Sequence, residues 1–104
     1  MFRAVAVLTF IATALPARGA GISDAEALAI VQKHCVMCHA VKPAHESIRE
    51  TPKNVALETI AEIREHAAAV YTQTVQTKAM PLGNQTGMTD DERSALGQWL
   101  KGVP

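Results

Sequence analysis

Cys35-Val36-Met37-Cys38-His39 places two thiols and an imidazole within one short stretch of the chain. Two cysteines separated by two residues, with a histidine directly after them, form the attachment signature of a c-type haem. Each thiol can add to one porphyrin vinyl group, and the imidazole can bind the iron from the proximal side. The motif therefore predicts one covalent haem c, held by thioethers at Cys35 and Cys38 and by His39.

The same cysteine pair has two other interpretations. A thioredoxin-like disulfide motif belongs to a βαβ unit, and the sequence shows no alternating apolar and polar runs that predict strands. A structural zinc site usually takes a second ligand pair at similar spacing, whereas Cys35 and Cys38 are the only cysteines in the sequence. Both interpretations are weaker than haem attachment, although the motif alone leaves them open.

Met1–Gly19 has the pattern of a secretory signal peptide. Arg3 supplies a short basic region, residues 4–15 are apolar, and small residues follow Pro16. The apolar run is shorter than the roughly 20 residues of a membrane-spanning helix. We therefore expect an exported, periplasmic protein with one domain over residues 20–104 and no stable membrane insertion, with an uncleaved membrane anchor as the alternative.

The charge balance and the aromatic content of the chain bear on its binding partners and on its core. The ten basic and ten acidic residues become eight and ten once Arg3 and Arg18 leave with the signal peptide. Nucleic-acid-binding domains carry a basic patch or stripe, which this balance does not suggest. The chain has one Trp, one Tyr and two Phe, and both Phe lie in the predicted signal peptide. In so small a domain, the haem is expected to supply much of the apolar core.

Two capping-box patterns mark the starts of helices. Ser23–Glu26 precedes apolar residues at helical spacing, and that helix is expected to run into Cys35. Thr89–Glu92 begins a second helix, which Gly102 ends. Trp99 lies on the apolar face of this second helix and is expected to pack against the first one.

The middle of the chain combines a loop with a further helical segment. Ala40–Asn54 is polar and contains two prolines, so we expect a loop, and Pro52 is the expected carbonyl partner of the His39 Nδ1. Val55–Thr77 has apolar residues at three- and four-residue spacings, with a break expected near residues 66–69. These patterns together predict an all-α fold.

Lys78–Met88 is a loop that could carry a second iron ligand, because one proline and two glycines interrupt regular structure. Met80 precedes Pro81, which fixes the neighbouring backbone and lowers the entropy lost when the thioether binds iron. Met88 directly precedes the last helix, at the position of a hydrophobic staple, which is a structural reason for its presence. We predict Met80 as the distal ligand, with Met88 as the second candidate.

The remaining histidines are weaker candidates for iron ligation. His34 directly precedes the motif and is badly placed for an axial bond, while His45 lies in a polar loop. His66 would give bis-histidine ligation from the middle helical segment. Tyr71 and Arg49 are candidate contacts of the haem propionates.

The motif at Cys35–His39, the loop with Met80-Pro81 and the closing helix with Trp99 resemble the class I cytochrome c family. Ala79–Thr89 is, more narrowly, similar to the C-terminal cytochrome c domain of bacterial membrane-bound urate oxidases (urate hydroxylases). The resemblance implies a small fold in which the N- and C-terminal helices pack together around one haem. It also implies redox-protein partners, which for the narrower likeness would include a membrane-bound oxidase or dehydrogenase, although this chain shows no multi-span membrane region.

These observations predict an electron carrier rather than an enzyme. With His39 and Met80 both bound, the iron would have no open position for a substrate. A five-coordinate haem peroxidase or gas sensor is the alternative, and a peroxidase needs a positioned distal acid–base pair that the sequence does not indicate.

Overall fold

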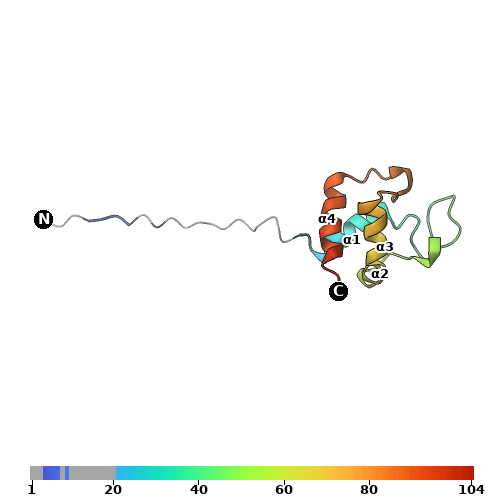
Figure 1. The fold of residues 1–104 in the computed structure, drawn as a ribbon, viewed down its shortest axis with the longest axis horizontal. Coiled ribbons are helices and arrows are strands. Elements are labelled where there is room, and N and C mark those ends of the chain that lie inside the picture. Colours follow the sequence, from blue (N-terminus) through green and yellow to red (C-terminus); the bar gives the residue numbers. More distant parts are fainter. Residues whose placement is uncertain (1–3, 8, 10–20) are drawn as a thin grey trace.

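The computed structural model describes residues 4–7, 9 and 21–104 (Figure 1). Most of the predicted signal peptide at Met1–Gly19 lies outside these residues. The described part of the chain contains helices and no strand, which confirms the predicted all-α fold. Its main helices are α1 (Asp24–His34), α2 (Ile60–Glu65), α3 (Ala67–Tyr71) and α4 (Asp90–Lys101). No helix in this part combines the length and apolar character needed to cross a bilayer.

Side-chain caps define where the helices begin. At α1, the Ser23 side chain accepts a hydrogen bond from the Glu26 amide at 3.1 Å. At α4, the capping box is formed in both directions, with Thr89 accepting from the Glu92 amide and Glu92 accepting from the Thr89 amide, each at 3.1 Å. Each bond satisfies an amide that a helix start leaves without an intrahelical partner.

The middle helical segment begins later in the sequence than predicted. A second complete capping box, between Thr59 and Glu62, begins α2 at Ile60, so the prediction of a helix from Val55 is wrong for its first residues. The predicted break is confirmed at His66, where φ is −104° and ψ is 17°. A π-helical turn at Thr72–Gln76 then continues α3. The remaining regular turns are the 3₁₀ segments Pro52–Asn54 and Leu82–Asn84.

Helix α4 packs against both α1 and α3, as Figure 1 shows. Gly97 permits the close approach to α3 and the turn after it, because a Cβ there would lie 3.0 Å from Val75 Cγ2 and 3.5 Å from Tyr71 Cε2. The largest fully buried side chains come from three helices. They are Val31, Ile63 and Leu96.

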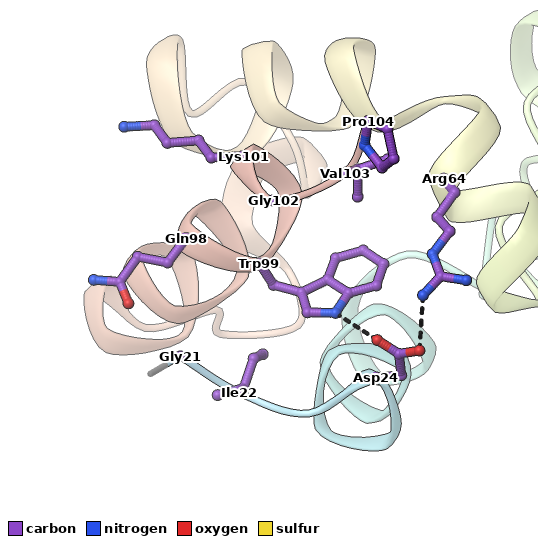
Figure 2. A pocket seen from close by; sticks show the side chains of 10 residues that line it. All are labelled: Gly21, Ile22, Asp24, Arg64, Gln98, Trp99, Lys101, Gly102, Val103 and Pro104. Atoms are coloured by element: carbon purple, nitrogen blue, oxygen red, sulfur yellow. Dashed lines mark hydrogen bonds and ion pairs between the residues drawn. The ribbon is translucent and has the colours of Figure 1, made fainter. Parts of the chain in front are cut away.

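Trp99 joins three helices on the other side of α4, which confirms its expected packing against α1. Its Nε1 donates a hydrogen bond to Asp24 Oδ1 at 3.0 Å, and Arg64 Nη2 donates to Asp24 Oδ2 at 2.8 Å (Figure 2). The Arg64 guanidinium also lies over the indole ring, 5.9 Å from its centroid, within the range of a cation–π contact. An open hollow of about 640 Å³ borders these residues.

Candidate functional site

Two apolar cavities, of about 150 and 260 Å³, lie beside the Cys35–His39 motif. Cys35, His39 and Met80 border both of them, so the two cavities adjoin one another. Cys38 borders the first cavity only. The hollow at Trp99 shares no lining residue with either cavity. All four residues predicted to hold the haem are therefore gathered around one apolar space.

The apolar lining of this space comes from segments far apart in the sequence. Ile48 and Leu82 border the first cavity, and Val55, Leu57 and Val70 border the second. A porphyrin is a large, predominantly apolar group, and buried apolar surface is what such a space offers it. The chemistry of the donors also fits, because thiols, imidazole and thioether are groups that hold haem in proteins.

The end of α1 positions the cysteines. The Cys35 amide donates to the Val31 carbonyl at 2.8 Å, and the His39 amide donates to the Cys35 carbonyl at 2.8 Å. These bonds continue the backbone of α1 as a helical turn through Cys35–His39. Burial, followed by the neighbouring Cys38, raises the pKa of the Cys35 thiol to about 11. A raised thiol pKa is typical of a cysteine buried in apolar surroundings.

His39 is fixed through both its backbone and its ring. Its Nδ1 donates to the Val55 carbonyl at 2.7 Å, and its own carbonyl accepts from the Leu57 amide at 2.8 Å. Because a carbonyl oxygen carries no proton, Nδ1 must be protonated, which leaves Nε2 as the nitrogen available to a metal. The prediction of Pro52 as the carbonyl partner is wrong. The Pro52 carbonyl instead accepts from the Val55 amide at 2.9 Å within the 3₁₀ turn.

The two candidate methionines occupy different environments. Met80 is half-buried and borders both cavities. Met88 is 4 % exposed, belongs to the core cluster that includes Leu96, and borders neither cavity. The expected hydrophobic staple is not formed, because the staple partner position on α4 is Arg93.

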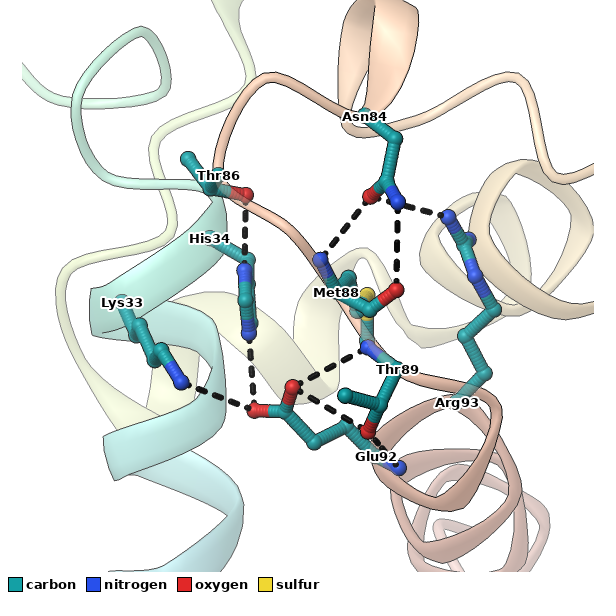
Figure 3. A network of polar contacts seen from close by, with 8 residues as sticks. All are labelled: Lys33, His34, Asn84, Thr86, Met88, Thr89, Glu92 and Arg93. Carbon is teal, nitrogen blue, oxygen red and sulfur yellow. Dashed lines mark hydrogen bonds and ion pairs between the residues drawn. The ribbon is translucent and has the colours of Figure 1, made fainter.

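Two side chains organise the loop between Met80 and α4 (Figure 3). Arg93 Nη1 donates to the Met80 carbonyl at 2.8 Å. Asn84 closes the next part of the loop, because its Oδ1 accepts from the Met88 amide at 2.9 Å and its Nδ2 donates to the Met88 carbonyl at 3.2 Å. The predicted ligand loop is therefore held by specific bonds at both ends.

His34 joins this loop to α1 and α4, a role that the sequence analysis missed. Its buried ring lies 2.7 Å from Thr86 Oγ1 through Nδ1, and its Nε2 donates to Glu92 Oε2 at 2.7 Å (Figure 3). Lys33 Nζ lies 3.7 Å from the same carboxylate oxygen. The ring is thus engaged at both nitrogens, which agrees with the prediction that His34 is badly placed as an axial ligand.

Other candidate residues lie apart from the cavities or at their edge. His66, Tyr71 and Arg49 border neither cavity, so the structure does not bring them to the site. Lys101 Nζ lies instead over the Tyr71 ring, 5.4 Å from its centroid. His45, in the polar loop, is half-buried and borders the first cavity, and its Nδ1 accepts a hydrogen bond from the Ser47 amide at 3.1 Å.

The Glu92 carboxyl makes the stability of this region depend on pH. Burial alone would raise its pKa, but hydrogen bonds from His34 and from the Thr89 backbone, together with the charge of Lys33, outweigh burial and hold that pKa below its usual range. A carboxylate of this kind stabilises the fold above its unfolded pKa of about 4.3, and the contribution is lost as pH falls through the lower folded pKa.

Glu92→Gln should lower the free energy of unfolding by about 1 kcal/mol near pH 7, since glutamine can keep the capping bonds but loses the charged partner of His34. The difference from wild type should shrink as pH falls below about 4. Denaturant unfolding at several pH values measures it, with Asp91→Asn as a control that removes a carboxylate from the same turn. A difference that does not change with pH would contradict the linkage.

The family model described as Cytochrome c matches residues 18–104, most of the sequence. No curated protein and no solved structure matches it. The family match supports the resemblance to class I cytochromes c, whereas none of these comparisons supports the narrower resemblance to urate oxidases.

Proposed function

The chain belongs to the cytochrome c family, and from this premise we propose that it carries single electrons through a haem whose iron is bound by His39 and Met80. Family membership implies haem c as a covalently bound cofactor. The observation that carries the proposal is the shared border of Cys35, His39 and Met80 on the same two apolar cavities. A thioether ligand and an imidazole ligand from distant segments can thereby serve one iron.

Each residue has a defined part in this proposal. Cys35 and Cys38 hold the porphyrin by thioethers, and the bound haem supplies a ferric/ferrous one-electron couple. The His39 Nδ1–H bond to Val55 fixes the ring orientation and makes Nε2 a stronger donor. Met80 favours the reduced iron and so raises the potential relative to a second histidine. The apolar lining keeps water from the site, which is a further influence on potential.

The location and the partners follow as expectations of the same proposal. The leader pattern at Met1–Gly19 supports export to the periplasm, where bacterial c-type haem is attached. Redox proteins are the partners that the family implies. A membrane-bound oxidase or dehydrogenase is the finer proposal, and reduction of the purified protein by substrate-energised membranes would test it.

Coexpression with a haem c maturation system should give a protein that keeps its haem under denaturing conditions. The ferric form should show a far-red methionine-to-iron charge-transfer band, and voltammetry should show one reversible one-electron wave. Protein without covalent haem would overturn the proposal. A five-coordinate ferric spectrum would instead support the peroxidase or gas-sensor alternative.

A further inference from the structure

Arg93 is a buried cation that contacts carbonyl oxygens. Its side chain extends from the first turns of α4, and the residue is 7 % exposed. Nη1 donates to the Thr74 carbonyl at 2.7 Å and to the Met80 carbonyl at 2.8 Å, and Nη2 lies 3.5 Å from Asn84 Oδ1. Among the ion pairs found within the described part of the chain, none includes Arg93. A buried charge without a counter-ion is costly unless its hydrogen bonds are satisfied, so these bonds are its compensation.

The two carbonyls that Arg93 joins belong to different segments. Thr74 lies in the π-helical turn after α3, is buried, and is itself fixed by a hydrogen bond from its Oγ1 to the Val70 carbonyl at 2.7 Å. Met80 lies in the loop that follows that turn. Arg93 therefore connects the loop to the buried turn that follows α3, in addition to contacting the loop itself.

Met80 is held at both of its backbone polar groups. Its amide donates to the Gln73 carbonyl at 2.9 Å, and its carbonyl accepts from Arg93. Asn84 connects the Arg93 guanidinium to Met88, at the far end of the same loop. A residue fixed at its amide and at its carbonyl has little freedom to carry its side chain away from the cavities that it borders.

We propose that Arg93 is a positioning residue for Met80, whose backbone it locks so that the thioether stays at the iron. This inference rests on the proposed function, in which Met80 is the distal ligand. A merely structural Arg93 would lower the free energy of unfolding without weakening the bond between Met80 and iron. Displacement of the thioether by an added ligand distinguishes the two roles, because the apparent affinity of the competitor rises when Met80 binds less firmly.

Imidazole titration of the ferric full-length holoprotein, followed at the far-red band, is the test. In Arg93→Gln the apparent affinity for imidazole should rise about tenfold or more, as expected for the loss of charge-assisted hydrogen bonds. Arg93→Lys should show a smaller rise, because lysine keeps the charge but not the planar fork that reaches two carbonyls. If Arg93→Gln does not retain haem, the imidazole titration of Arg93→Lys replaces it as the test.

Arg64→Gln is the matched control. It removes an arginine that donates a hydrogen bond to Asp24 and lies over the Trp99 ring, and that lines neither cavity. It should therefore lower the free energy of unfolding while leaving the imidazole affinity unchanged. An equal rise in Arg64→Gln and Arg93→Gln would overturn the proposal in favour of general destabilisation. Unchanged affinity in both Arg93 variants would also overturn it.

Met80→Ala separates this inference from the function on which it rests. If the far-red band survives in Met80→Ala, the proposed ligation fails, and the positioning role fails with it. If Met80→Ala loses the band while the Arg93 variants bind imidazole as wild type does, the inference alone fails. Loss of the band in Met80→Ala together with tighter imidazole binding in the Arg93 variants supports both.

Discussion

Met80→Ala should abolish the far-red charge-transfer band and lower the reduction potential, whereas Met88→Ala should preserve the band. A thioether ligand stabilises ferrous iron, so replacing the proposed Met80 ligand by water or another group should remove that preference. We expect a fall on the order of 0.1 V or more, within the roughly 0.8 V range over which axial ligands set haem potentials. Absorption spectra of the ferric variants and voltammetry measure the two effects.

The Met88→Ala variant is a strict control because Met88 is a buried core residue, so its replacement should destabilise the fold without removing the proposed ligand. It is 4 % exposed in the core, so its truncation should cost about 2–5 kcal/mol of unfolding free energy. Met80→Ala should therefore change chiefly the absorption spectrum and the reduction potential. Met88→Ala should change chiefly the free energy of unfolding. Loss of the band in Met88→Ala, with retention in Met80→Ala, would transfer the ligand role to Met88.

The features that sequence predicted well depend on short-range patterns. A capping box and a helix-ending glycine each act within a few residues, so the start of α4 at Thr89–Glu92 and its end at Gly102 could be predicted without knowing the fold. The roles of Cys35, Cys38 and His39 in holding a haem remain predictions. The break predicted near residues 66–69 is also present, at His66. At Val55 the prediction of a helix failed, although the Thr59–Glu62 capping box that delays the helix was itself a readable local signal.

The features that sequence did not predict depend on contacts between distant segments. The sequence analysis predicts that His39 donates to the Pro52 carbonyl. In the structure that carbonyl accepts a hydrogen bond from the Val55 amide within a 3₁₀ turn, and His39 donates to the Val55 carbonyl instead. Periodicity did contain a signal for two of the missed residues. His34 continues the buried face of Ala27 and Val31, and a polar side chain on such a face needs a partner.

Arg93 follows the same rule on α4, three residues before Leu96 and seven before Leu100, on the face that packs into the core. A charged residue at a core-facing position predicts a buried hydrogen-bonding role. It does not say which groups accept the bonds. Those acceptors are backbone carbonyls of Thr74 and Met80, whose positions depend on the π-helical turn and the loop that follows it.

Replacing both motif cysteines, in Cys35→Ala/Cys38→Ala, should give protein without covalent haem and with most of its helical structure lost. Apolar side chains from three segments line the two cavities, and each is worth about 1.5–3 kcal/mol when fully buried. The net stability of a domain is only roughly 5–15 kcal/mol, so losing a haem that would fill these cavities should remove a large part of it. Haem staining of denaturing gels and far-ultraviolet circular dichroism measure both effects.

Met37→Leu is the matched control for this variant, since Met37 lies between the two cysteines and is 47 % exposed. It should retain covalent haem, helical content and thermal stability close to those of wild type, because a leucine of similar volume replaces an exposed side chain. If the double variant folded with native helical content, the haem would not be needed as part of the core. Such a result would show that α1, α3 and α4 close around a purely protein interior, and the cavities beside Cys35 and His39 would then have to collapse.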